Sequence, residues 1–139
     1  MSLREFLSSP VSCRPEVSLA EAASQMDSHG VGSVVVVDDA NHVVGIVTDR
    51  DIVVRGIARE LSPSTPVREV MTSDVVSLSE DADLFDAAQQ MASGECRRMP
   101  VVDAEGNLKG VVSLDDLMVI FSRQTGSLAQ VIAAEHVAH

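Results

Sequence analysis

The amino-acid sequence predicts an α+β fold, in which two β-α-β-β-α units pack sheet to sheet about a pseudo-twofold axis. The first observation is an internal repeat, because the chain matches itself without a gap after a shift of 65 residues. The second is that each copy alternates strand-like and helix-like apolar periodicity. The third is that a unit with helices on one face leaves its sheet bare on the other. We therefore expect one two-repeat domain and not two independent ones.

The repeat places residues 10–56 over residues 75–121, and 15 of these 47 positions are identical. Its limits divide the chain into a first repeat (8–60), a connector (61–73), a second repeat (74–124) and a C-terminal helical tail (125–139). Pro63 and Pro66 mark the connector, since proline interrupts regular structure. One helical turn is expected within it, at Val67–Met71.

Each unit opens with a short strand and a helix. The strands are expected at Val11–Cys13 and Val75–Leu78. Each helix carries an i, i+3, i+4, i+7 apolar stripe, formed by Leu19, Ala22, Ala23 and Met26 and by Leu84, Ala87, Ala88 and Met91. Ser18 with Glu21 forms a capping box at the first helix, and Asp83 caps the second. The methionines of these stripes are interpreted as core filler.

A hairpin and a second helix complete each unit. β-branched runs predict the hairpin strands, at Ser33–Val37 with Val43–Val47 and at Met99–Val102 with Leu108–Val112. The turns between them are rich in Asp, Asn and Gly. The final helices are expected to begin at Thr48 and Ser113. The tail keeps Leu128, Val131 and Ile132 at helical spacing, and this face is a candidate for packing on a partner subunit.

Composition and charge argue against several functions. The net charge is −11, and nine of the ten basic residues are arginine. Nucleic acid and anionic membranes attract a basic surface, and the chain has no Trp or Tyr on which bases could stack. Neither partner is expected. No apolar run approaches the ~18 residues of a membrane span. The sequence shows no signal peptide, so a reducing cytoplasm is expected. Cys13 and Cys96 are then expected to be unpaired thiols, and a disulfide between them is the alternative.

The most specific short pattern occurs twice, where the last strand of each repeat meets the last helix. Residues 45–51 and 110–116 both read Gly-apolar-Val-hydroxyl-x-x-Asp. One interpretation is a helix cap, since a hydroxyl with an acidic residue three positions later is a capping box. The other is a ligand site, where the hydroxyl and backbone N–H groups meet a phosphate and the carboxylate accepts from a ribose diol. One group can serve both roles.

The whole repeat resembles a tandem pair of CBS domains, also called a Bateman module. The resemblance rests on both corner motifs and on the strings Met99-Pro100-Val101-Val102-Asp103 and Thr48-Asp49-Arg50-Asp51, and it covers residues 8–124. With no catalytic domain attached, the chain is similar to the stand-alone bacterial CBS-pair proteins. The resemblance implies a regulatory module that binds AMP, ADP or ATP, or else NAD or S-adenosylmethionine, in two clefts between the repeats.

The resemblance also implies which residues form each cleft. In the first, Asp51 would take the ribose hydroxyls and Thr48 a phosphate, and the remaining lining would be Val75, Val76, Cys96 and Val111. In the second, Asp116 and Ser113 would take the polar roles, and the base would be surrounded by Pro10, Val11, Val31 and Ile46. Aliphatic side chains would hold the adenine, because the chain offers no Trp or Tyr to stack on it.

The two copies differ where the resemblance implies phosphate contacts. The second repeat carries Arg97-Arg98 before its middle strand, where the first carries Gly32-Ser33. Arginine contacts phosphate bidentately, so the cleft of Thr48 and Asp51 is expected to bind more tightly. Arg50 is a second phosphate candidate. The alternative is that these arginines only neutralise nearby acids on the surface.

The sequence does not predict an enzyme. His29, His42, His136 and His139 have no spacing that joins them to cysteines or carboxylates, so no metal site is expected. A phosphate loop, a nucleophile elbow and a dinucleotide fingerprint are missing. The leading hypothesis is an adenine-nucleotide sensor without an obligatory cofactor, helped by Mg²⁺ if the ligand is ATP, whose ligand changes the contact with an unknown protein target. The alternative is a ligand-free homodimeric interaction protein.

Overall fold

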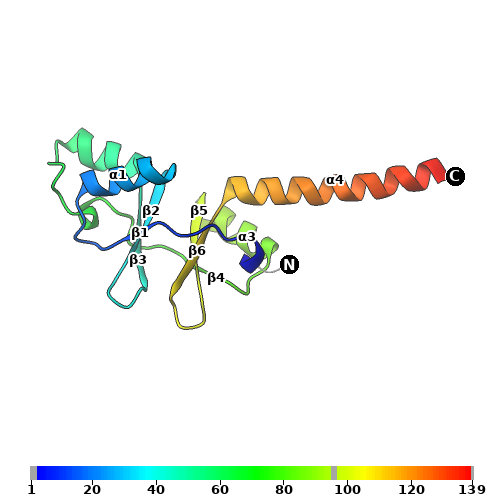
Figure 1. Cartoon of the computed structure of the whole chain (residues 1–139), viewed down its shortest axis with the longest axis horizontal. Helices are drawn as coiled ribbons and strands as arrows, with labels where there is room; N and C mark the ends of the chain where they lie inside the picture. The colour runs from blue at the N-terminus through cyan, green and yellow to red at the C-terminus, as the bar shows by residue number, and fades with distance from the viewer. Residues whose placement is uncertain (1–2, 95–96, 139) are drawn as a thin grey trace.

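The computed structural model describes residues 3–94 and 97–138 and contains the two expected units side by side (Figure 1). Each unit holds a three-stranded sheet, ordered β1-β2-β3 in the first and β4-β5-β6 in the second. In each sheet the first two strands pair in parallel and the last two pair antiparallel. The α+β fold with two β-α-β-β-α repeats is confirmed.

The first unit follows the predicted order closely. Its elements are β1 (Ser12–Cys13), α1 (Leu19–His29), β2 (Ser33–Val37), β3 (Val43–Thr48) and α2 (Asp49–Asp51), which continues as a π-helical segment (Ile52–Gly56) and a 3-10 turn (Ile57–Arg59). At the start of α1 the Glu21 N–H donates to Ser18 Oγ at 3.1 Å, as the capping pattern predicts. Gly30 ends the helix in the left-handed conformation, which glycine adopts without a steric penalty.

The second unit repeats this order with a longer last helix. Its elements are β4 (Leu78–Ser79), α3 (Leu84–Gly94), β5 (Arg98–Val102), β6 (Leu108–Ser113) and α4 (Leu114–Ala138). β4 is shorter than the predicted strand and begins after Val75 and Val76. α4 runs without a break through Gly126 into the predicted tail. A single glycine weakens a helix by only about 1 kcal/mol, which is too little to end it there.

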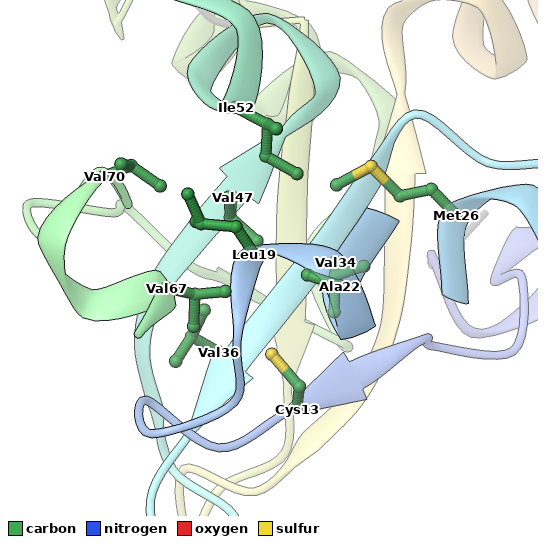
Figure 2. Close-up of a cluster of buried hydrophobic side chains, with 10 residues drawn as sticks. All are labelled: Cys13, Leu19, Ala22, Met26, Val34, Val36, Val47, Ile52, Val67 and Val70. Atoms are coloured by element: carbon green, nitrogen blue, oxygen red, sulfur yellow. The ribbon is translucent and has the colours of Figure 1, made fainter. Parts of the chain in front are cut away.

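The apolar stripe of α1, apart from Ala23, which is exposed, packs on its sheet to form the first core (Figure 2). Leu19, Ala22 and Met26 are each no more than 7% exposed, and they meet Val34, Val36 and Val47 of the strands. The corresponding stripe of α3 forms the second core with Met99, Val101 and Val112. Met26 and Met91 are both buried, so the interpretation of these methionines as core filler is confirmed.

Each core is completed by the segment that precedes the other repeat. Val67 and Val70, from the predicted connector, point into the first core (Figure 2), where the Val67 N–H donates to the Val17 carbonyl at 2.8 Å. Leu3, at the N-terminus, is fully buried in the second core, and its N–H donates to the Ala82 carbonyl at 3.0 Å. Both segments form a short 3-10 turn, at Leu3–Phe6 and Val67–Glu69.

The same two segments then pass over the glycines of the corner motifs. Thr72 pairs with Ile46 through two backbone hydrogen bonds of 3.0 and 2.9 Å, and Ser8 bridges to Val111. A Cβ on Gly45 would lie 2.9 Å from the Thr72 carbonyl oxygen, and a Cβ on Gly110 would lie 2.9 Å from that of Ser8. The corner glycines are therefore required by the close approach of another backbone.

The two sheets bury their remaining faces against each other. Val35 and Val37 of β2 form a cluster with Leu108 of β6, and Val43 and Val111 pack around it. The Leu108 N–H also donates to the Asn41 carbonyl at 3.1 Å, which joins the two hairpins. This cluster supplies the apolar cover that each sheet lacks within its own unit.

The two hairpin turns are stabilised by equivalent aspartates. Asp38 Oδ1 accepts from the N–H groups of Ala40 and His42 at 2.9 Å each. Asp103 Oδ1 accepts likewise in the second hairpin, from the N–H groups of Glu105 and Asn107. The hydrogen bond from the His42 N–H lowers the pKa of Asp38, and the one from Asn107 lowers the pKa of Asp103.

Replacing Gly110 with alanine tests the close approach of the N-terminal segment. The new Cβ would lie 2.9 Å from both the Ser8 carbonyl oxygen and Leu7 Cβ. We expect Gly110→Ala to lower the free energy of unfolding in urea by about 1–3 kcal/mol, the usual cost of overpacking. Gly126→Ala is the matched control, because nothing lies within 4 Å of its Cβ position, and it should be neutral or stabilising. Equal destabilisation by both changes would contradict this account.

The turn aspartates predict a pH dependence of stability. Because the pKa of each carboxyl is lower in the folded than in the unfolded chain, the stabilisation is complete above the unfolded value of about 3.9 and is lost as pH falls through the folded value. Urea denaturation should show wild type more stable than Asp38→Asn/Asp103→Asn at pH 7, with the gap closing in acid. Asp27→Asn, on the exposed surface of α1, controls for a lost charge. A gap that is constant with pH would refute the prediction.

Candidate functional site

Both corner motifs form the cap that their spacing predicts. At the first corner the Asp51 N–H donates to Thr48 Oγ1 and the Thr48 N–H donates to Asp51 Oδ2, both at 3.0 Å. At the second corner the corresponding distances between Ser113 and Asp116 are 3.0 and 3.4 Å. These caps use only one oxygen of each carboxylate. A ligand hydroxyl can therefore be accepted by the other oxygen while the cap persists.

The first corner opens into a hollow of about 360 Å³, called here the first cleft. It is lined by Ile46, Thr48, Asp49, Arg50, Asp51, Thr72, Arg97 and Arg98, so both repeats contribute. The polar residues expected for this cleft, Thr48, Asp51 and the three arginines, lie together. Val75, Val76 and Val111 are not part of its lining, and Cys96 lies outside the described residues.

The second corner opens into a hollow of about 370 Å³, the second cleft. It is lined by Ser8, Ser9, Val11, Gly30, Val31, Gly32, Ser33, Arg98, Val111, Ser113, Asp115 and Asp116. Four residues expected here, Val11, Val31, Ser113 and Asp116, lie together. Pro10 is exposed and lies outside the lining.

Two apolar residues lie in the opposite cleft from the expected one. Ile46 lines the first cleft beside Thr48, and Val111 lines the second beside Ser113. The reason is the alternation of side chains along a strand, which puts residues two apart on the same face. The corner motif itself carries this signal, because its apolar residue stands two positions before the hydroxyl. Thr72 and Ser8, which the motif analysis did not identify, reach the clefts through their pairing with Ile46 and Val111.

The arginine pair divides its contacts between the clefts. Arg97 lines the first cleft and forms an ion pair of 3.4 Å with Asp115, a residue of the second. Both side chains are mostly exposed, so this ion pair is weak. Arg98 lines both clefts. A Cβ on Gly32 would lie 3.1 Å from Arg98 Nη2 and from Asp49 Oδ2, so the guanidinium reaches the backbone of the first repeat.

The charges of the two clefts differ in sign. The first cleft has three arginines against two aspartates. The second has one arginine, Arg98, against Asp115 and Asp116. Because a phosphate group needs local positive charge, the first cleft is better suited to an anionic ligand. The order of affinity expected from the Arg97-Arg98 pair stays a prediction.

Cys13 is a free thiol that lies in the first core and takes no part in the clefts. Burial, with a smaller effect of Glu21, raises the pKa of its thiol to about 11. It is therefore a neutral structural residue at pH 7. In the described part of the chain, no helix combines the length and the apolar character needed to cross a membrane.

The chain is similar to known proteins in both sequence and structure. A protein of Acidianus ambivalens described as an uncharacterized 17.7 kDa protein is 42% identical over 104 residues, which are 75% of this chain and 62% of that protein. This chain therefore spans less than two thirds of that relative. The structure of a CBS domain protein from Pyrobaculum aerophilum complexed with AMP has a TM-score of 0.77 and 26% identity, and the match covers 84% of this chain and 89% of that one.

A further structure extends the same comparison. The CBS domain pair of protein MJ0100, solved in complex with 5′-methylthioadenosine and S-adenosyl-L-methionine, has a TM-score of 0.80 and 26% identity, and the match covers 89% of this chain and 98% of that one. The sequence model of the CBS domain family matches residues 3–56 and 67–123. Both matched regions begin at the segment whose apolar residues complete a core, at Leu3 and Val67. With two copies of the domain in one fold, the chain belongs to the CBS domain family and is a tandem CBS pair.

Proposed function

We propose that this protein is a non-enzymatic regulatory module that binds an adenine nucleotide, AMP, ADP or ATP, between its two repeats. The observation that carries the proposal is the composition of the first cleft. In a chain with a net charge of −11, three arginines line this cleft together with Thr48 and two aspartates. Such a set has the donors for a phosphate and the acceptor for a ribose diol in one hollow.

Each group of a nucleotide has a suitable partner in this cleft. The second carboxylate oxygen of Asp51 accepts from the ribose hydroxyls, and Thr48 with Arg97 and Arg98 contacts the phosphate. Ile46 offers an aliphatic surface for the base. The solved relatives support the class of ligand, since one was crystallised with AMP and the other with two adenosyl compounds. S-adenosylmethionine and NAD are therefore the alternative ligands.

Binding between the repeats gives the ligand a way to act on a partner. Both clefts take residues from each repeat, so a bound nucleotide favours one relative position of the two units over others. A coupling of about 1–3 kcal/mol is sufficient to change the affinity for a protein target. With ATP as the ligand, Mg²⁺ would help to neutralise the triphosphate near Asp49 and Asp51.

The two corner aspartates should each control one site. Isothermal titration of wild type with AMP is expected to give binding below millimolar, and Asp51→Ala should abolish the tighter site because it removes the ribose acceptor. Asp116→Ala should leave that site intact and is the matched control, since both variants lose one cap. Circular dichroism verifies that each is folded. If AMP, ATP, NAD and S-adenosylmethionine all fail to bind below millimolar, the proposed function is wrong.

A homodimer is the second proposal, and α4 supports it. Leu128, Val131 and Ile132 are 66%, 57% and 56% exposed, on the part of the helix that extends away from the two units (Figure 1). Residues 124–134 include no charged side chain. A second copy therefore meets little like-charge repulsion along this segment, although the protein has a net charge of −11. The ligand-free interaction protein remains the alternative function that this surface favours.

Charges placed on the apolar face of α4 should dissociate the dimer. We expect sedimentation velocity to show wild type as a dimer at tens of micromolar and Leu128→Glu/Ile132→Glu as a monomer. Gln130→Glu/Ala133→Glu adds the same two charges to the opposite face of the helix and should remain dimeric. A monomeric wild type, or equal dissociation of both variants, would contradict the proposed dimer.

A further inference from the structure

Arg98 occupies a position that the proposed nucleotide site leaves unexplained, because it belongs to both clefts. It stands at the first position of β5, where it pairs with Ser113, and it is among the lining residues of both clefts. Its guanidinium lies over Gly32, where an added Cβ would come within 3.1 Å of Nη2. The equivalent position in the first repeat is Ser33, so the chain has no second arginine of this kind.

The two clefts depend on Arg98 to different degrees. In the first cleft Arg50 and Arg97 can also contact a phosphate. In the second, Arg98 is the only cation among the described lining residues, which also include Asp115 and Asp116. Without Arg98, a phosphate in the second cleft would meet two negative charges and no positive one.

We propose that Arg98 is a phosphate ligand shared by the two clefts, so that a phosphate bound in the first cleft prevents tight binding of a second phosphate ligand in the other. The second cleft then takes an adenosyl compound that has no phosphate. This inference rests on the proposed nucleotide-binding function and adds the class of ligand that each cleft accepts.

The physical basis is the geometry of the guanidinium group. Its donors lie in one plane, and a bidentate pair with a phosphate in the first cleft fixes the direction of that plane and neutralises the single positive charge. Once these donors point into the first cleft, the second cleft keeps only its two aspartates. The Arg97–Asp115 ion pair acts in the same direction, because a phosphate that attracts Arg97 leaves the Asp115 charge uncompensated in the second cleft. An uncharged adenosyl ligand needs no contact with the Arg98 guanidinium, so its binding to the second cleft does not depend on a phosphate in the first.

The coupling can be measured by titrating the second cleft with the first either filled or disabled. The probes are AMP and adenosine, and the proteins are wild type and Asp51→Ala, the latter lacking the ribose acceptor of the first cleft only. We expect AMP to bind the second cleft about 10-fold more tightly in Asp51→Ala than in wild type saturated at the first cleft. Adenosine should bind the second cleft with the same affinity in both, within about 2-fold.

A second pair of variants identifies Arg98 as the shared group. Arg98→Ala should weaken AMP at both clefts by about 10-fold or more and leave adenosine unchanged. Arg50→Ala is the matched control, because Arg50 lines the first cleft alone and should weaken AMP there only. Asp116→Ala lacks the ribose acceptor of the second cleft, so a titration of this variant measures binding at the first cleft alone.

The outcomes separate this inference from the function on which it rests. If neither AMP nor adenosine binds wild type, the proposed function itself fails. If both bind, but AMP fills the second cleft equally well with the first cleft filled or disabled, the coupling is refuted and the nucleotide-binding function stands. An effect of Arg98→Ala confined to one cleft would likewise overturn the shared role.

Discussion

The fold depends on the exchange of two short segments between the repeats. Leu3 fills the core of the second unit and Val67 and Val70 fill the core of the first, although each segment leads into the other repeat. The side chains of Leu3 and Val67 are fully buried. Removing either segment would open a cavity in a small core, and such cavities typically cost 2–5 kcal/mol for a large aliphatic residue. The core of each repeat is therefore incomplete without the segment that leads into the other repeat.

This exchange also builds the rims of the two clefts. After it leaves its core, each segment adds a backbone pair to the edge of a sheet, Ser8 to Val111 and Thr72 to Ile46, directly beside a corner motif. The corner glycines leave room for these backbones, and Ser8 and Thr72 become part of the cleft linings. The duplicated glycine and the duplicated Thr/Ser–Asp pair thus serve one arrangement. The glycine leaves room for the backbone of the neighbouring segment, and the Thr/Ser–Asp pair caps the helix that begins at the same corner.

The repeat, the strands and the two polar corners were predictable from the sequence, because an ungapped match of residues 10–56 to 75–121 places equivalent residues at equivalent positions. The exchanged segments were missed for a specific reason. Residues 3–9 correspond to residues 67–73 with a shift of 64, and not 65, so that Arg4, Glu5 and Ser9 match Arg68, Glu69 and Ser73. One additional residue after this stretch hides the match. The resemblance also implied the wrong cleft for Ile46 and for Val111, whereas the alternation of side chains along a strand assigns both correctly.

The two clefts have the same backbone framework and differ in a few side chains. Only these side chains can make the clefts prefer different ligands. The caps of both corners have nearly the same geometry, and the two hollows have similar volumes of about 360 and 370 Å³. Backbone position and size therefore cannot distinguish a nucleotide from a nucleoside. Charge can, because Arg97 and Arg98 stand where the first repeat has Gly32 and Ser33, and Arg50 adds a third positive charge to the first cleft alone. Discrimination between the clefts must then come from these arginines and from the direction in which Arg98 donates.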